Sequence, residues 1–456
     1  MTSSRDAVAV ANRIAASNRC YELLESLCIC FPGRISGSEI LEKALDFLLK
    51  HGQETLPPGC CYEERVDGIP RWVRGEPDST CTASIDPNGS SPPEPFPLTR
   101  VFRILTNGMS VGTSPVGVQG SLVIVNTWDQ LKALGEDGRL QGAVVLYDYK
   151  TYTDYGTHSR FRSSGASEAA RYGAVAVLIR TITPDSSTSG IHTGQMVYQE
   201  GIPRVPAACM AIEDVEVLSR LLARGHSLSV TIRAQCYQLP DVVSRNIIYE
   251  IKGCEFPDEV VVVGGHTDSW CGAHDDGQGV CVSMECVRRM HELGLRPKRT
   301  IRAVLFVDEE CTQRGGICYA RDHKQEMDDG SIVAAIETDL GAGPCVGFGY
   351  GSIFENALPV VSLQLTYLFS YSDRVMHRWS GNGVDITPMI VEGKVPGLLL
   401  RHEDKWWCED YFHFHHSSSD TIDHIDPVLL EQNLKVISAA VWVLANSDEK
   451  LTLYSD

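Results

Sequence analysis

The feature that most constrains this chain is the recurrence of metal-binding side chains directly after apolar runs in its C-terminal half. Three runs have the composition of buried strands, and each leads into a candidate ligand: Val260–Val263 before His266, Ile301–Val307 before Glu310, and Ile332–Ile336 before Asp339. In an open α/β sheet, chemistry gathers outside the carboxyl ends of the strands. Several acids together with two histidines at such an edge predict a metal cage.

Length and composition limit the classes of protein that fit. The 456 residues make two domains the default, although one large α/β domain with an insertion fits as well. With 43% hydrophobic and 22% charged residues, the chain is typical of a globular protein. The formal net charge of −19 argues against a nucleic-acid partner. No uninterrupted apolar run has the eighteen or so residues that a membrane span needs, so we expect no membrane span.

The C-terminal half alternates between strand and helix patterns. Strands are expected near 246–252, 259–264, 300–307, 331–337 and 395–400. Helices are expected at 279–293 and 428–444, with Asp426 as the cap of the second one. This alternation predicts an α/β fold with a mixed, mostly parallel sheet flanked by helices. Helical periodicity at 8–30, and a helix capped by Ser38, predict further helices that pack on this sheet.

Residues 98–236 have a different pattern from the rest of the chain. Short strands near 116–125, 142–147, 174–179, 206–211 and 228–232, with few helices, predict a compact β-rich module without a catalytic constellation. The Pro-, Gly- and Ser-rich stretch 84–97 is typical of a linker. We therefore expect a discontinuous catalytic domain, residues 1–97 and 237–456, and an inserted domain, residues 98–236.

Each candidate motif also has an ordinary structural explanation. His266-Thr-Asp268 can be a surface pair, Asp275-Asp276 a helix cap, Glu309-Glu310 a solvated loop, and Asp339 a turn carboxylate. Any one of His413, His415 and His416 can be a half-buried ring. Zinc, however, binds histidine nitrogen and carboxylate oxygen, and two zinc ions about 3.5–4 Å apart can share a carboxylate and a water. Such a site needs two histidines and about three acids, which the chain offers.

Taken together and in this order, the motifs resemble those of the co-catalytic two-zinc aminopeptidases and carboxypeptidases. The series is His266-Thr-Asp268, Asp275-Asp276-Gly277, Glu309-Glu310, Glu337-Thr-Asp339 and His416-Ser-Ser-Ser-Asp420. The resemblance extends from about residue 10 to 445. It includes segments such as Gly33-Arg-Ile-Ser-Gly-Ser38, and the middle block resembles a protease-associated insert.

The resemblance implies a role for each matching residue. His266 and Asp339 would bind one zinc ion, Glu310 and His416 the other, and Asp275 would bridge the two. Glu309 would be the general base, and Asp268 would orient His266. His416 is chosen among the three clustered histidines because the family places its ligand four residues before an aspartate, here Asp420. His274, beside Asp275, is an extra possible ligand.

The function implied is a zinc-dependent exopeptidase of the carboxypeptidase or dipeptidase type, acting on dipeptides or short peptides. The alternatives are an aminopeptidase of the same family, or an inactive relative that serves as a binding or receptor domain. Inactive relatives usually lose ligands or the base, and all six positions are present here. That completeness favours the enzyme.

The resemblance also implies a homodimer and a secreted or lysosomal location. Sixteen cysteines and the glycosylation sequon Asn88-Gly-Ser90 fit that location, whereas the N-terminus Met1-Thr-Ser-Ser-Arg-Asp lacks the apolar region of a signal peptide. Cys60, Cys61 and Cys81 are possible disulfide partners, although buried free thiols are equally compatible with the pattern.

Overall fold

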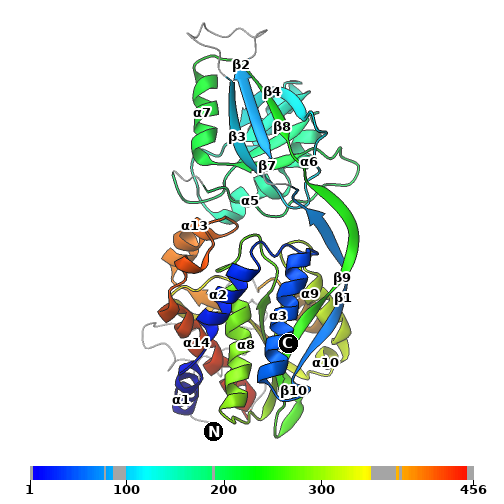
Figure 1. The fold of residues 1–456 in the computed structure, drawn as a ribbon. Helices are drawn as coiled ribbons and strands as arrows, with labels where there is room; N and C mark the ends of the chain where they lie inside the picture. Colours follow the sequence, from blue (N-terminus) through cyan, green and yellow to red (C-terminus); the bar gives the residue numbers. More distant parts are fainter. Residues whose placement is uncertain are drawn as a thin grey trace, which may run out of the picture. The chain divides into compact units, whose positions relative to one another are not determined.

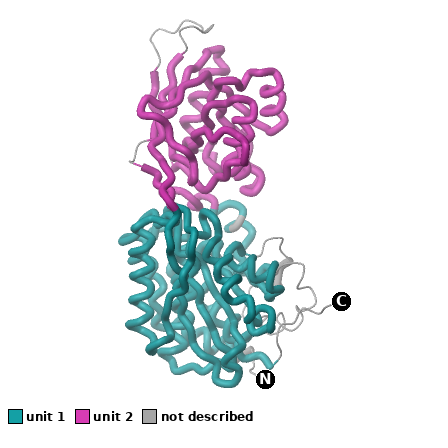
Figure 2. The backbone as a smooth tube through the Cα atoms, turned by 90° about the vertical axis from the view of Figure 1, so that its right-hand side faces the viewer, with its two compact units in different colours: residues 1–70, 241–411, 420–456 teal, residues 71–240, 412–419 magenta. Residues whose placement is uncertain are grey.

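In the computed structural model, residues 4–75, 79–85, 99–186, 190–350, 376–378 and 383–448 are described. The chain forms two compact units (Figure 2). Unit 1 comprises Met1–Pro70, Asp241–Tyr411 and Asp420–Asp456, and unit 2 comprises Arg71–Pro240 and Phe412–Ser419. The sequon Asn88–Ser90 lies outside the described residues.

The N-terminal part of unit 1 is helical. The helices are α1 (Ser4–Ala15), α2 (Cys20–Cys30) and α3 (Glu39–Thr55). The periodic stretch 8–30 is thus two helices rather than one. The Ser38 side chain accepts a hydrogen bond from Leu41 N, so the predicted cap of α3 is confirmed.

Unit 1 contains an eight-stranded sheet. Its order is β1 (Cys61–Val73), β9 (Tyr237–Ile251), β11 (Arg299–Phe306), β10 (Phe256–His266), β12 (Ile332–Glu337), β15 (Gly397–His402), β13 (Cys345–Tyr350) and β14 (Met376–Arg378). β10 is parallel to both β11 and β12, whereas β9 runs antiparallel to β11 and β13 antiparallel to β15. The predicted mixed α/β fold is confirmed, but β1, β13 and β14 were not predicted.

Helices cover the sheet of unit 1 (Figure 1). α8 (Gly277–Glu292) and α14 (Pro427–Asn446) pack on β10 and β11, while α9 (Arg314–Asp322), α10 (Lys324–Asp328) and α12 (Thr387–Gly393) pack on one another. All four residues of Val260–Val263 are buried. Because neighbouring residues of a strand point to opposite faces, both faces of β10 are covered.

The register of the parallel strands brings the candidate ligands to one edge. His266 is paired with Phe306 and Gly264 with Glu337. β10, β11 and β12 therefore end side by side. The segments that follow β11 and β12, which carry Glu310 and Asp339, start at the same edge as His266.

The last long helix, α14, begins as predicted. Asp426 accepts a hydrogen bond from Val428 N, and Pro427 occupies the first turn. By length and composition alone, α14 is the one helix among the described residues that could cross a membrane, but most of it is buried in unit 1 against α1 and α8. Short turns precede it in the chain: a π-helix at Trp406–Asp410, α13 (Tyr411–Phe414), and a 3-10 helix at Ile422–His424.

Unit 2 is built on a closed barrel of seven strands. Their order is β2 (Thr80–Ile85), β3 (Thr99–Thr106), β7 (Ala207–Met210), β6 (Ala176–Arg180), β5 (Ala143–Tyr147), β4 (Val118–Val125) and β8 (Leu228–Arg233). The helices are α4 (Trp128–Glu136), α5 (Tyr155–Ser163), α6 (Gly165–Ala170) and α7 (Ile212–Ala223). Alternate residues of β5 belong to two separate apolar clusters, so the strand is buried on both sides.

The compact units divide at positions other than the predicted 97/98 and 236/237. β2 lies before the Pro-rich stretch, yet it pairs with β3 and β8 in the barrel. The chain passes between the units within β1 and β9, because the divisions at 70/71 and 240/241 fall inside these two strands. Most of the predicted linker, residues 84–97, lies outside the described residues, and the strands on either side of it, β2 and β3, both belong to the barrel of unit 2.

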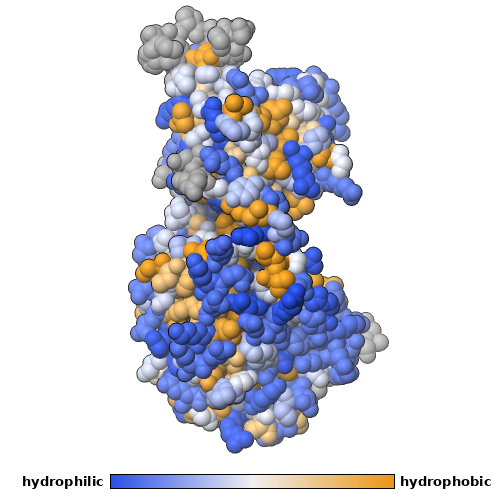
Figure 3. Space-filling view, turned by 45° about the vertical axis from the view of Figure 1, so that its right-hand side comes forward, coloured by the Kyte–Doolittle hydropathy of each residue, from blue (hydrophilic) through white to orange (hydrophobic). Residues whose placement is uncertain are grey.

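All sixteen cysteines are free thiols, including Cys60, Cys61 and Cys81. Most of them are buried. The interpretation of these cysteines as small apolar core residues therefore fits this structure better than a disulfide framework does. The surface shown in Figure 3 is largely hydrophilic, with hydrophobic residues scattered over it. The main apolar clusters are in the interiors of the two units.

One half-buried ion-pair network in unit 1 predicts a pH-dependent stability. His323 Nε2 lies 3.1 Å from Glu64 Oε1, and its Nδ1 lies 3.1 Å from Glu326 Oε2. Burial lowers the pKa of His323, but the hydrogen bonds to Glu326 and Glu64 outweigh it and raise the pKa to about 9. A raised folded-state pKa stabilises the fold fully below the unfolded-state value of about 6.5, and the effect is lost as the pH rises through 9.

We therefore expect His323→Gln to lose up to about 3 kcal/mol of unfolding free energy at pH 6, since each pKa unit is worth about 1.4 kcal/mol. The difference from the unsubstituted protein should shrink towards zero above pH 9. Urea unfolding at pH 6, 7.5 and 9.5 measures it. A difference that stays constant over this range would contradict the prediction.

Candidate metal centre

His266 is the centre of the candidate site, at the end of β10 in unit 1. Its main-chain N donates to Asp276 Oδ2 at 3.1 Å, and its Nδ1 bonds to the main-chain oxygen of Asp268 at 2.8 Å. A Cβ atom at Gly265 would lie 2.2 Å from Asp276 Oδ2, so glycine is needed there for the carboxylate to approach the strand. A carbonyl partner at Nδ1 fixes the tautomer in which Nε2 carries the lone pair.

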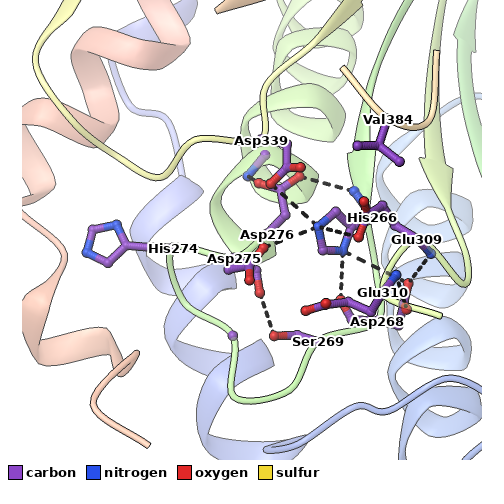
Figure 4. A network of polar contacts seen from close by, with 12 residues as sticks. His266, Asp268, Ser269, His274, Asp275, Asp276, Glu309, Glu310, Asp339 and Val384 are labelled. Carbon is purple, nitrogen blue, oxygen red and sulfur yellow. Dashed lines mark hydrogen bonds and ion pairs between the residues drawn. The ribbon is translucent and has the colours of Figure 1, made fainter. Parts of the chain in front are cut away.

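Three carboxylates surround His266 Nε2 (Figure 4). Asp275 Oδ1 lies 3.4 Å away, Asp339 Oδ1 3.5 Å and Glu309 Oε2 3.9 Å. His266, Asp275 and Asp339 each offer one ligand atom, and these three atoms lie within 4.8 Å of one another. A nitrogen and two oxygens at this spacing form the kind of donor set that zinc takes from proteins.

The two adjacent aspartates have different roles. The Asp276 carboxylate accepts from Gly279 N and Gln278 Nε2, both at 3.0 Å, in addition to His266 N, so it caps α8 and joins it to β10. The Asp275 main chain donates to Asp420 Oδ2 at 3.1 Å and accepts from Ser269 Oγ at 2.5 Å. Its backbone is held from both sides and its carboxylate faces His266. The role of Asp275 as a metal ligand stays a prediction.

Asp268 holds the acidic turn after β11. Its Oδ1 accepts from Glu309 N and its Oδ2 from Glu310 N, both at 3.1 Å. The sequence predicts that Asp268 orients His266, but the orienting bond comes from its main-chain oxygen, and its carboxylate lies 4.0 Å from Nδ1. The carboxylate is committed to two main-chain N–H groups, which physically explains the difference.

Glu337 and Asp339 differ in the same way as Asp276 and Asp275: one carboxylate binds main-chain N–H groups and the other faces His266. Glu337, at the end of β12, accepts from Val384 N at 2.7 Å and from Ile386 N at 2.9 Å. It therefore fixes the segment that precedes α12, and Asp339 is the acid that faces His266. In both pairs, one carboxylate holds the backbone and the other lies at the candidate metal site.

The site contains more buried negative charge than its side chains can balance. Burial raises the pKa of Glu309 well above its usual range, and the nearby Asp339 and Glu310 add to the effect against His266. Burial lowers the pKa of His266, but Asp339 and Asp275 outweigh it and raise the pKa well above 6.5. Because buried ionised carboxylates are costly unless paired, a divalent cation fits this donor set.

His416 lies in unit 2, within Phe412–Ser419, whereas the other four proposed ligands lie in unit 1. Its Nδ1 lies 3.1 Å from the Thr193 carbonyl oxygen, and its own carbonyl accepts from Thr193 N at 2.9 Å. A proton on Nδ1 leaves the lone pair on Nε2, the form suited to a metal ligand. The membership of His416 in the site stays a prediction.

His274 does not join the group around His266. Figure 4 shows its ring pointing away from the acids, and its Nδ1 accepts from Ala342 N at 3.2 Å. Sequence reasoning also missed the buried Arg34 and Ser36, which hydrogen-bond to the loop after His266 and to Asp268. Their only signal was the segment Gly33–Ser38, which contributed to the family resemblance without a role of its own.

The chain is similar in sequence to known proteins along nearly its whole length. Carboxypeptidase Q of Bos taurus is 34% identical over 443 residues, which cover 96% of this chain and 87% of that protein. The model of peptidase family M28 matches residues 246–441. This chain belongs to peptidase family M28. The predicted metallo-exopeptidase is confirmed by this membership.

Solved structures of the M28 family agree with the fold. The crystal structure of a peptidase M28 precursor from Shewanella amazonensis SB2B is 31% identical, covers 99% of both chains and has a TM-score of 0.87. A zinc aminopeptidase from Bacillus subtilis is 18% identical, covers 95% of this chain and 97% of its own, and has a TM-score of 0.67. At that identity, the second comparison supports the fold alone.

Removal of divalent ions should destabilise this M28 protein, because Asp275, Asp339 and Glu309 then repel one another inside unit 1. Zinc at 100 times its dissociation constant should restore about 2.7 kcal/mol. Thermal unfolding after dialysis against a chelator, with and without added zinc, measures the effect. In His266→Ala the zinc-dependent part should shrink strongly. Equal melting temperatures for the chelated and zinc-loaded protein would contradict the assignment.

Proposed function

We propose that this chain is a two-zinc exopeptidase that hydrolyses dipeptides or short peptides, with Glu309 as the general base. The observation that carries the proposal is the convergence of the Asp275, Asp339 and Glu309 carboxylates on His266 Nε2, at 3.4 to 3.9 Å. His266 and Asp339 would hold one zinc ion, Glu310 and His416 the other, and Asp275 both.

Bound zinc would supply Lewis acidity, which polarises a carbonyl and brings the pKa of water towards neutrality. The side chains of the protein carry out the proton transfers. Glu309 takes the proton of the attacking water and returns it to the nitrogen of the leaving amine. Asp268 accepts hydrogen bonds from Glu309 N and Glu310 N. It thereby keeps Glu309, the proposed base, at a fixed position relative to Glu310, the proposed ligand.

Glu309 suits this role better than its neighbour. Its side chain is 15% exposed, so water can reach it, while Glu310 is buried. After Glu309 has taken the proton of the water, it can act as the acid of the second step.

The carboxypeptidase or dipeptidase type is proposed because the relatives named carboxypeptidase Q match over most of their length. An aminopeptidase of the same family is the second candidate. An inactive relative is disfavoured by the complete set of candidate residues. The protease-associated nature of residues 98–236, a homodimer, and a secreted or lysosomal location stay expectations from the resemblance, and the sixteen free thiols add no support for that location.

Glu309→Gln should lose at least 100-fold in kcat, because general-base catalysis contributes roughly 10²–10⁴-fold. The amide keeps the size of the side chain, so zinc content measured by plasma mass spectrometry should be unchanged. Glu25→Gln, at an exposed position of α2, is the matched control and should be fully active. A Glu309→Gln variant with a near-normal rate would refute the role.

A single assay separates the exopeptidase types. A free dipeptide, its N-acetyl form and its C-terminal amide are each incubated with the enzyme, with and without a chelator. A carboxypeptidase or dipeptidase should cleave the free dipeptide and leave the amide intact, and chelation should stop the reaction. Cleavage of the amide but not of the N-acetyl form would establish the aminopeptidase instead.

A further inference from the structure

A fully buried arginine holds the loop that carries the candidate ligands. Arg34 follows α2 and donates from Nε to the Thr267 carbonyl oxygen at 2.9 Å and from Nη2 to the Gly272 oxygen at 3.1 Å. A third bond, from Nη1 to Phe31 O, is 3.4 Å long. Thr267 and Gly272 lie within the loop that joins His266 to Asp275, and a single guanidinium therefore spans it.

The loop is shaped to receive the guanidinium. Gly272 has a φ of +78°, and a Cβ atom there would lie 2.7 Å from Arg34 Nη2 and 2.4 Å from Ser269 Oγ. Ser269 N donates to the Arg34 carbonyl oxygen at 2.9 Å, so main chain and side chain of Arg34 bind the same loop. Only glycine at 272 combines this backbone angle with room for the arginine.

The next polar residue of the segment reaches the other half of the site. Ser36 Oγ donates to Asp268 Oδ2 at 2.7 Å, and both side chains are buried. Asp268 in turn binds Glu309 N and Glu310 N. Residues 34–36 are thus connected to the His266–Asp275 loop through Arg34 and to the Glu309–Glu310 turn through Ser36.

A buried carboxylate holds the far end of the same loop. Asp420 accepts from His274 N at 2.7 Å and from Asp275 N at 3.1 Å. The Asp420 carboxylate therefore holds the main chain of His274 and Asp275, at the end of the loop that Arg34 spans.

We propose that Arg34 and Ser36 form a positioning clamp for the metal centre. Arg34 sets the separation of His266 and Asp275 and thereby the zinc affinity, and Ser36 sets the position of Glu309 through Asp268. The inference rests on the proposed function of this site. The planar guanidinium is essential because it donates to two separate carbonyl groups at once, which the point charge of lysine does not reproduce.

The test of Arg34 measures zinc affinity, which is independent of peptidase activity. Arg34→Lys should bind zinc at least tenfold more weakly in competition with a chromophoric chelator, a loss typical of groups that support metal ligands. Arg289→Lys is the matched control. Arg289 is also buried and also donates to three main-chain oxygens, those of Ile14, Arg13 and Ala16, but it joins α8 to α1.

Arg289→Lys should lower the melting temperature and leave zinc affinity unchanged. Equal zinc affinities in both variants and in the unsubstituted protein would overturn the role of Arg34. Equal losses in the two variants would also overturn it, because the effect would then be general destabilisation. If the unsubstituted protein binds zinc without cleaving peptides, the proposed function fails while the clamp can still be tested.

Ser36→Ala provides the second variant, since it removes one hydroxyl and is expected to fold. Its zinc content should be unchanged and its KM close to normal, while kcat falls about tenfold or more because the Glu309 turn loses part of its support. Thr55→Ala, which removes a hydroxyl bonded to His51 O at the end of α3, controls for loss of a similar bond. A kcat equal to that of Thr55→Ala would overturn the role of Ser36.

Discussion

The arrangement of unit 1 depends on how its buried carboxylates are balanced. An ionised carboxylate is costly to bury unless it is paired or hydrogen-bonded. One group achieves this with main-chain N–H groups: Asp268, Asp276, Glu337 and Asp420 each accept two of them. The second group, Asp275, Asp339 and Glu309, converges on a single imidazole. The first group fixes the loops, and the second is left with an excess of negative charge that suits divalent ions.

The sheet explains why these acids meet although they are distant in sequence. β10 lies between β11 and β12 and is parallel to both, so three loops leave the same edge. β10 itself ends at His266 and the loop after it supplies Asp275, while the loop after β11 supplies Glu309 and the loop after β12 supplies Asp339. Helix α8 then begins at Asp276, whose carboxylate joins it to β10. Burial of the strands therefore determines the position of the polar groups at their ends.

The sequence predicted the parts of this arrangement that leave a local pattern. Apolar runs marked β10, β11 and β12, and the acids that follow them marked the site. β1, β13 and β14 were missed because their sequences contain no uninterrupted apolar run: charged residues interrupt β1 and β14, and glycines interrupt β13. The clamp of Arg34 on Thr267 and Gly272 joins residues 233 and 238 positions apart, and no local pattern encodes that distance. The sequence also did not predict which oxygen of Asp268 contacts His266, because residue spacing does not reveal whether the side-chain carboxylate or the main-chain carbonyl bonds to the imidazole.

The central claim is that the acids around His266 hold zinc. Anomalous diffraction at the zinc edge from crystals of the zinc-loaded protein tests it most directly. The account predicts two peaks about 3.5–4 Å apart, one beside His266 and Asp339 and the other beside Glu310 and His416, with Asp275 between them. A zinc-loaded crystal with no peak beside His266 would contradict it.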